Sequence, residues 1–287
     1  MKLTNILALV FVVFLWGSSF TVLKIGVYEL TPVTLAFLRF LIAIPFLIII
    51  TQGQHKNPFR KQFFKEWKKF SLLGLTGVTL YNILQNFGLQ FTTASTASLI
   101  IASNPIFIAV LDHFYLKEKT ALRLILGVFL AFLGIFLVIK PFEWSLHPMV
   151  LFGDLLCLGG ALCWALYSVF SRKILSEYKA SEITTYVMLF GTFFLLPFML
   201  ALEKFVLPTS LFIWLLLLFL GLFCSGLAYL LWGKALEEIP ATKAGVFLYF
   251  IPVVSVSIAH FVLLEPIDIF FVVGTIFVMA GVAITEL

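Results

Sequence analysis

One stretch of this chain occurs twice, and the duplication constrains its architecture more than any other feature of the sequence. The first copy runs from Tyr81 to Glu118 and the second from Tyr229 to Glu265. Nearly the same offset relates positions within these copies and on either side of them. The corresponding pairs are Trp16 and Trp164, Lys24 and Arg172, Ala97 and Ala244, Pro105 and Pro252, Gly127 and Gly274, and Gly134 and Gly281. The sequence therefore predicts two related halves, residues 1–145 and 146–287, each a copy of one unit.

Apolar runs long enough to cross a bilayer fill both halves. A transmembrane helix needs about 20 mainly apolar residues. Charged residues make up only 11% of the chain, against roughly a quarter in soluble domains. The runs are Ile6–Ile25, Val33–Thr51, Phe70–Leu89, Ser95–Phe114, Ala121–Lys140, Leu151–Ser171, Ile183–Leu202, Leu211–Trp232, Lys243–Leu263 and Ile267–Thr285. We therefore expect an all-α integral membrane protein with ten transmembrane helices, five in each half.

An odd number of spans in each half determines how the halves are related. The second half must enter the membrane upside down relative to the first, which makes two inverted five-helix repeats. Lys and Arg residues gather in every second connection, and such residues mark cytoplasmic loops. The opposite connections hold acidic residues such as Glu29, Glu203 and Glu265. We expect a multi-pass protein of the cytoplasmic membrane with both termini in the cytoplasm.

The longest basic connection also indicates a contact with membrane lipids. Phe59, Phe63, Trp67 and Phe70 recur there at helical spacing, with Lys and Arg residues between them. This pattern is typical of an amphipathic helix that lies on the inner leaflet. The basic loops account for the net charge of +5, so we expect no nucleic-acid partner.

Motifs of enzymes and cofactor sites are missing from the sequence. No G-x-x-x-x-G-K-[ST] phosphate-binding loop occurs, so the chain has no ATP motor of its own. The four histidines show neither metal-ligand nor triad spacing, and the three cysteines lie in apolar runs. We expect no enzymatic activity, no metal and no cofactor.

Aromatic and amide side chains repeat on one face of several spans. Amides cannot face hydrocarbon without a cost in free energy, so these faces should turn toward other helices or a wet cavity. In one reading these residues only pack helices or fill interfacial belts. In the other they line a central cavity that binds a small amphipathic solute. The substrate-binding residues of such a cavity would be Trp16, Tyr81, Gln85, Asn104, Trp164, Tyr167, Tyr229, Trp232 and Tyr249.

The inverted symmetry sharpens this expectation for four aromatic residues. Repeat mates occupy equivalent positions about a pseudo-two-fold axis. Trp16 and Trp164 should therefore both lie toward that axis, and so should Tyr81 and Tyr229. We expect these four to surround the substrate, with the other cavity residues beside them.

Two prolines fall inside expected spans. Pro105 lies in the fourth span and Pro252 in the ninth. Each removes a backbone N–H and frees a carbonyl one turn earlier. They are either fixed packing kinks or hinges that gate the cavity, and the sequence does not separate the two.

A few charged residues lie close to the spans. Glu118 and Glu265 precede the fifth and tenth spans, where a carboxylate favours the N-terminal dipole of the helix that follows. Lys24 and Arg172 end their spans, and we expect them to snorkel toward water. Arg39 lies about a third of the way into its span and must find a partner or water. It is a candidate for a substrate carboxylate or for an interhelical contact.

Several short motifs occur in an order typical of one transporter family. They are W-G-S-S-F at Trp16–Phe20, L-R-F at Leu38–Phe40 and the prolines of Asn104-Pro105 and Ile251-Pro252. Over essentially its whole length the chain resembles the EamA-type transporters of the drug/metabolite transporter superfamily. The resemblance implies ten helices, inverted repeats, a central cavity and the export of amino acids or other metabolites. The chain lacks the first-span Glu of the small multidrug antiporters, so the resemblance does not extend to their proton exchange.

Two functions are consistent with these observations. The first is a secondary transporter, an exporter of small organic metabolites such as amino acids, which works by alternating access between the repeats. The alternative is a lipid-headgroup flippase or a membrane-embedded enzyme that uses the same cavity. The expected partners are a small-molecule substrate and membrane lipids. The sequence leaves the oligomeric state open and is compatible with a monomer.

Overall fold

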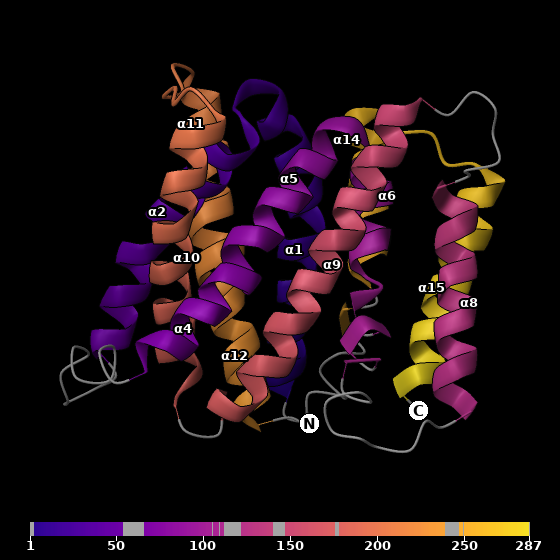
Figure 1. The fold of residues 1–287 in the computed structure, drawn as a ribbon, viewed down its shortest axis with the longest axis horizontal. Helices are drawn as coiled ribbons and strands as arrows, with labels where there is room; N and C mark the ends of the chain where they lie inside the picture. Colours follow the sequence, from indigo (N-terminus) through magenta and orange to yellow (C-terminus); the bar gives the residue numbers. More distant parts are fainter. Residues whose placement is uncertain are drawn as a thin grey trace.

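In the computed structural model, helices and the loops between them make up the part of the chain that it describes (Figure 1). That part comprises residues 3–53, 66–104, 106–108, 110–111, 122–139, 147–175, 178–238, 247–248 and 250–286. Apolar runs fold this way in a bilayer because lipid offers no hydrogen bonds, so each backbone N–H and C=O must be bonded within the segment. Pro105, Glu118, Tyr249 and most of the expected amphipathic segment lie outside the described residues.

The described part of each half contains seven helical segments. Those of the first half are α1 (Leu3–Glu29), α2 (Pro32–Gly53), α4 (Trp67–Gly74), η1 (Leu75–Leu80), α5 (Tyr81–Phe91), α6 (Ala94–Ile101) and α8 (Leu122–Ile139). Those of the second half are α9 (Pro148–Leu175), α10 (Ala180–Leu202), α11 (Leu211–Leu218), η2 (Phe219–Leu227), α12 (Ala228–Glu238), α14 (Ile251–Leu263) and α15 (Ile269–Glu286).

Five of these helical segments are long and apolar enough to cross a membrane, counting the described residues only. They are Leu3–Glu29, Pro32–Gln52, Pro148–Ser171, Ala180–Leu202 and Leu211–Ala235. Shorter apolar helices lie where other spans are expected, among them Leu126–Val138, Ile251–Leu263 and Ile269–Gly281. Large apolar side chains such as Phe129, Leu211 and Phe261 are more than half exposed on the outside of the bundle. A surface of this kind suits contact with lipid tails rather than water.

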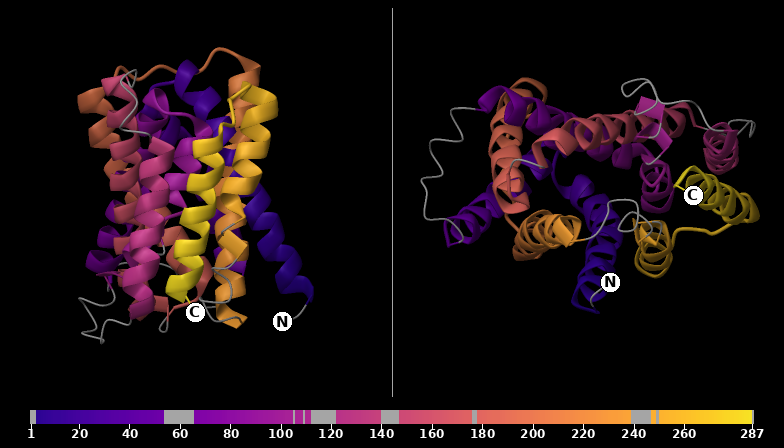
Figure 2. Two further views of the ribbon diagram at one scale, coloured as in Figure 1. Left: turned by 90° about the vertical axis from the view of Figure 1, so that its right-hand side faces the viewer. Right: turned by 90° about the horizontal axis from the view of Figure 1, so that it is seen from below.

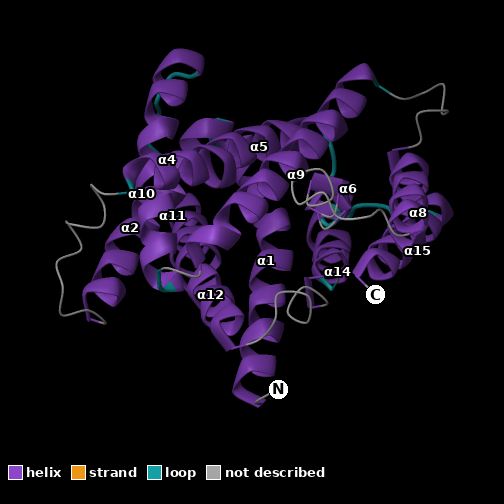
Figure 3. Ribbon diagram, turned by 60° about the horizontal axis from the view of Figure 1, so that its bottom comes forward, coloured by secondary structure: helices purple, strands orange, loops and turns teal. Residues whose placement is uncertain are grey.

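The helices form one bundle that runs along a common direction, with both chain termini at the same end (Figures 1 and 2). Helices α1, α5, α9 and α12 lie in the middle, and α2, α10 and α11 lie at one side. Helices α8 and α15 pair at the opposite side, next to α6 and α14 (Figure 3). Helices from the two halves therefore contact one another throughout the bundle.

Glycines bring α8 and α15 into backbone contact. A Cβ added at Gly281 would lie 2.5 Å from the carbonyl oxygen of Gly127, and one added at Gly134 would lie 2.5 Å from that of Gly274. The lower-numbered glycine of one helix thus meets the higher-numbered glycine of the other, so the two helices run antiparallel. Close backbone approach through small residues is a common way to pack helices in membranes.

Two segments of π-helix interrupt the spans that carry Tyr81 and Tyr229. Segment η1 ends directly before Tyr81, and η2 ends at Leu227, two residues before Tyr229. A π-helix bonds residue i to i+5 instead of i+4, and such segments are frequent at functional sites. Glycines in both segments allow close packing: Gly77 lies against the ring of Tyr167, and Gly221 against the backbone carbonyl of Arg39.

Two carboxylates bind the N-termini of helices in the other half. Glu203 accepts hydrogen bonds from the backbone N–H groups of Val33 (2.8 Å) and Thr34 (2.9 Å) at the start of α2. Glu265 accepts from the N–H groups of Ala94 (2.8 Å) and Ser95 (3.0 Å) and from the Ser95 hydroxyl (2.5 Å) at the start of α6. The expectation that Glu265 serves the helix that follows it was therefore wrong. Its carboxylate satisfies the unpaired N–H groups of a different helix.

Lys24 is buried instead of snorkelling to water. Its ammonium donates to the carbonyl oxygens of Leu89 (2.5 Å) and Thr92 (2.6 Å) at the C-terminal end of α5. The hydroxyl of Thr92 in turn donates to the carboxylate of buried Asp154 (2.5 Å). The expectation for Lys24 was wrong because the last carbonyls of a helix attract a cation as effectively as water does. The side chain of Arg172, its repeat mate, lies outside the described residues.

Candidate functional site

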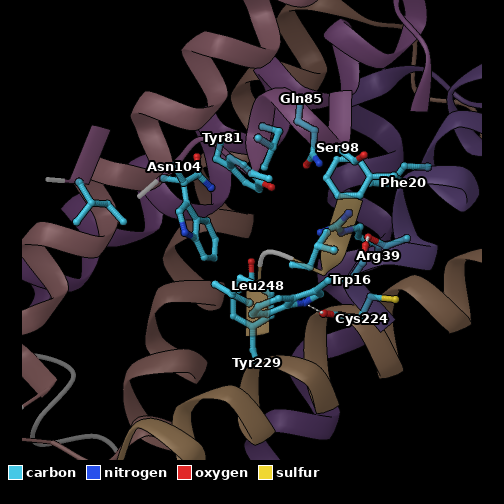
Figure 4. Close-up of a pocket in the computed structure, with 17 residues that line it drawn as sticks. Trp16, Phe20, Arg39, Tyr81, Gln85, Ser98, Asn104, Cys224, Tyr229 and Leu248 are labelled. Carbon is cyan, nitrogen blue, oxygen red and sulfur yellow. Dashed lines mark hydrogen bonds between the residues drawn. The ribbon is translucent and has the colours of Figure 1, made fainter. Parts of the chain in front are cut away.

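A cavity of about 120 Å³ lies between the helices of the two halves (Figure 4). The walls come from α1, α2, α5 and α6 of the first half and from α9, η2, α12 and α14 of the second. The volume is roughly ten times what one buried water requires, so a small organic molecule can be accommodated. The aromatic and polar residues of the wall are Trp16, Ser19, Phe20, Arg39, Tyr81, Gln85, Ser98, Asn104, Trp164, Cys224 and Tyr229.

Six of the nine residues expected to bind substrate line this cavity. They are Trp16, Tyr81, Gln85, Asn104, Trp164 and Tyr229. Two more lie directly behind the wall: the Tyr167 ring is 5.2 Å from Trp164 and the Trp232 ring is 5.7 Å from Trp16, measured between ring centroids. The ninth, Tyr249, lies outside the described residues.

The four aromatic repeat mates form one cluster of rings. Trp164 lies 6.5 Å from Trp16, 5.1 Å from Tyr81 and 6.0 Å from Tyr229, and Trp16 lies 5.4 Å from Tyr229, measured between centroids. Most of the pairs are edge-to-face or tilted, which is the arrangement that aromatic quadrupoles favour. Such a cluster presents both ring faces and ring edges to a bound molecule.

Trp16 is held in place by hydrogen bonds between α1 and η2. Its indole Nε1–H donates to the carbonyl oxygen of Cys224 at 3.0 Å (Figure 4). The Cys224 thiol donates back to the carbonyl oxygen of Leu15 at 3.3 Å. Because both partners sit at the cavity wall, this reciprocal pair fixes the orientation of the Trp16 ring.

Several polar atoms at the cavity have no protein partner in the described part of the chain. Arg39 is only 5% exposed, yet its Nε and Nη1 make no hydrogen bond. The side-chain oxygen of Asn104 is likewise unpartnered. Buried polar groups normally find a partner, so an unpartnered one in a cavity wall indicates a place for water or ligand.

Pro252 is placed differently from the sequence expectation. It occupies the first turn of α14, which follows Phe250, and not the interior of a continuous span. Proline is well tolerated there because the N–H that it lacks would be unpaired in any case. Pro252 therefore begins α14 instead of interrupting a continuous helix, and its role as a kink or a hinge stays a prediction. A hinge at Pro105 concerns a residue outside the described part of the chain.

The comparison with known proteins agrees with this architecture. The EamA-like transporter family matches the chain twice, over residues 3–140 and 151–287. This chain belongs to the EamA-like transporter family. Its helical bundle and apolar outer surface are therefore those of a membrane transporter family.

Relatives of this family member are similar over nearly their full length. An uncharacterized transporter of Archaeoglobus fulgidus is 34% identical, with 97% of this chain and 96% of the relative covered. The uncharacterized transporter YyaM of Bacillus subtilis is 33% identical, with 93% and 88% covered. A probable terminal-alkyne amino-acid exporter of Streptantibioticus cattleyicolor is 27% identical, with 90% and 86% covered.

A solved crystal structure shares the fold of this EamA-like chain. It superposes with a TM-score of 0.67 at 17% sequence identity and covers 99% of this chain and 96% of its own. At that identity the similarity concerns the fold alone.

Sequence reasoning missed part of the cavity wall. Ser98 and Cys224 line it, although neither was expected there. The sequence could have indicated Ser98, because it lies near Asn104 in the same span. Cys224 lies in an apolar run, and no feature of that run indicates a cavity residue. Arg39 was noted as a candidate for a carboxylate, and the structure places it in the wall.

Proposed function

We propose that this chain is a secondary transporter that exports small organic metabolites, such as amino acids, by alternating access around the cavity. The observation that carries the proposal is the position of the cavity. It lies where helices of the two halves meet, with the corresponding aromatic residues Trp16 and Trp164, and Tyr81 and Tyr229, in its wall. Transporters built from repeats bind their substrates at such a junction.

Reciprocal helix contacts support the two inverted repeats of five spans on which this mechanism depends. Helix α1 contacts α12, and the corresponding helix α9 contacts α5. Likewise α2 contacts η2, and α10 contacts η1. The antiparallel α8 and α15 add a pair in which Gly127 meets Gly281 and Gly134 meets Gly274. A two-fold axis produces this exchange of partners.

The aromatic wall supports an organic substrate over a bare ion. Ring faces and edges bind apolar bodies and cationic groups, whereas an ion pathway is lined by charged or carbonyl groups. A relative at 27% identity is named a probable terminal-alkyne amino-acid exporter. Amino acids are therefore the first class of substrate to test.

The test replaces Trp164 or Tyr81 with alanine and measures both flux and folding. Purified protein in liposomes is assayed for counterflow of radiolabelled amino acids without ATP, starting with L-phenylalanine. A Trp→Ala change in a packed core costs about 3–5 kcal/mol and lowers the folded yield. At a cavity wall we expect Trp164→Ala to keep most of its thermal stability while flux falls roughly tenfold or more, a barrier change of about 1.4 kcal/mol.

Trp67→Ala is the matched control, because Trp67 is half exposed at the start of α4 and does not line the cavity. It should retain wild-type flux. Normal flux in both cavity variants, or loss of flux only through unfolding, would favour the packing reading of the aromatic cluster. If no amino acid moves through the wild-type protein, the proposal for this substrate class fails.

A further inference from the structure

We infer that Arg39 is the group that selects the charge of the substrate, because it binds a carboxylate inside the cavity. The site would then take small organic acids and zwitterions with an apolar or aromatic body. Amines of the same shape that lack a carboxylate would bind poorly. This inference rests on the proposed function and names the substrate class of the same site.

The first observation is a buried cation without a partner. Arg39 belongs to α2, is 5% exposed, and its Nε and Nη1 bond to none of the described residues. The carbon of its guanidinium lies 4.5 Å from the centroid of the Phe40 ring. A charged side chain inside a membrane is costly unless something pairs with it, at about 2.5–3.5 kcal/mol on insertion scales.

The second observation is the lack of a compensating negative charge around the guanidinium. The titratable groups that act on it across the cavity are Tyr81, Tyr229 and Cys224, from α5, α12 and η2. Phenols and thiols ordinarily stay neutral at pH 7. No ion pair in the described part of the chain includes Arg39. An interhelical salt bridge therefore does not explain its burial, and a ligand anion does.

The third observation is the position of Arg39 relative to the aromatic cluster. Figure 4 shows Arg39 on one side of the cavity, near Phe20 and Trp16, with Tyr81 and Tyr229 on other sides. A molecule with a carboxylate at Arg39 would therefore lay its body on the rings. A guanidinium offers parallel N–H groups that match the two oxygens of a carboxylate.

A phosphate could also bind a guanidinium, but the charges favour a carboxylate. Arg39 supplies one positive charge, and among the described residues that line the cavity it is the sole Lys or Arg. One carboxylate neutralises it, and the ammonium group of an amino acid can lie against the aromatic rings of the wall. A doubly charged phosphate would instead leave a buried negative charge that no wall residue balances. Burying an uncompensated charge is strongly unfavourable.

The experiment compares three probes of similar size and different charge: L-phenylalanine, phenethylamine and phenyl phosphate. Binding to the detergent-purified protein is followed by tryptophan fluorescence, since Trp16 and Trp164 line the cavity. Hydrogen bonds to a charged group contribute about 1.5–3 kcal/mol, so the acid should bind roughly 10–100-fold more tightly than the amine. In Arg39→Gln this preference should disappear, and Arg39→Lys should restore part of it.

Lys68→Gln serves as the control, because it removes the same charge from a side chain outside the cavity. It should leave the acid-to-amine ratio unchanged. Equal affinity for acid and amine in the wild-type protein, tighter binding of phenyl phosphate, or an unchanged preference in Arg39→Gln would each overturn the inference. If Arg39→Gln does not fold, the acid-to-amine affinity ratios of the wild-type protein and of Arg39→Lys test the inference instead.

Liposome flux separates this inference from the proposed function. If phenethylamine crosses through the wild-type protein and L-phenylalanine does not, the protein is a transporter but Arg39 does not select carboxylates. If neither the acid nor the amine binds or crosses, the inference fails, whereas the proposed function fails only if no other amino acid crosses either.

Discussion

Replacing Glu265 with glutamine tests whether this carboxylate stabilises the packing of the two halves. Glu265 is 8% exposed and accepts three hydrogen bonds at the start of α6, from two backbone N–H groups and the Ser95 hydroxyl. Glutamine keeps the shape but loses the charge and one acceptor. Its NH₂ group would face the N–H of either Ala94 or Ser95, which is then left without a partner.

The expected loss of stability follows from these contacts. When a neutral acceptor replaces a charged one, the contribution of the hydrogen bond to stability falls by about 1 kcal/mol. A buried N–H left without a partner costs about 1–3 kcal/mol more. The sum is about 2–4 kcal/mol, or a fall in melting temperature of about 5–10 °C for a chain of this size. A carboxylate that served only the dipole of α15 would contribute about 0.3–1 kcal/mol.

The assay is thermal unfolding of the purified variant in detergent, with the rate of unfolding at one temperature as a second measure. Glu29→Gln is the matched control, since Glu29 is exposed and the charge change is the same. A surface change of that kind should shift the stability by less than about 0.5 kcal/mol. If Glu265→Gln unfolds within about 3 °C of wild type, the contact with α6 does not carry the stability assigned to it.

Three further predictions follow from the packing and the topology. Lys24→Met should lower the melting temperature by several degrees, because two carbonyls at the end of α5 lose a charged donor, whereas a snorkelling lysine could be replaced at little cost. Gly281→Ala should destabilise the protein by at least about 1 kcal/mol, because the new Cβ overlaps backbone atoms of α8. Gly159→Ala, whose Cβ meets only Leu84 at 3.4 Å, should be neutral or stabilising in the same thermal assay. In a background without other cysteines, a cysteine replacing Lys204 should be labelled from outside the cell and one replacing Gln52 only after the membrane is permeabilised; the reverse pattern would overturn the proposed orientation.

The sequence predicted the centre of the site better than its periphery. Trp16 and Trp164, and Tyr81 and Tyr229, are related by the repeat offset, and mates related by a two-fold axis approach one another wherever they face that axis. The Trp16 and Trp164 rings lie close together as this reasoning requires, and Tyr81 and Tyr229 each lie beside the tryptophan of the other half. An argument of that kind needs only the offset and the helical phase, both of which can be read from the sequence.

The contacts of isolated charges were harder to predict. Glu265 and its partners on α6 are about 170 residues apart in the chain, and nothing in the local sequence distinguishes them from the nearer helix α15. The prediction that Lys24 snorkels to water failed for a similar reason, because a lysine at the end of an apolar run is equally suited to water and to a neighbouring helix end. The π segments have no sequence signature comparable with the glycine or proline signals of turns.

The two π segments determine which side chains their helices turn toward the cavity. A π-helix holds one residue more in each hydrogen-bonded ring than an α-helix does. Removal of one residue from Leu75–Leu80 would allow that segment to become an α-helix. The rest of α5 would then keep its orientation, because the deleted residue is the extra one that the wider ring holds. If the segment became an α-helix without a deletion, α5 would turn by about 100°, since a helix has about 3.6 residues per turn, and Tyr81 would leave the wall. A change between π- and α-helix in η1 or η2 is thus a route by which the side chains presented to a substrate can change while the sequence stays the same.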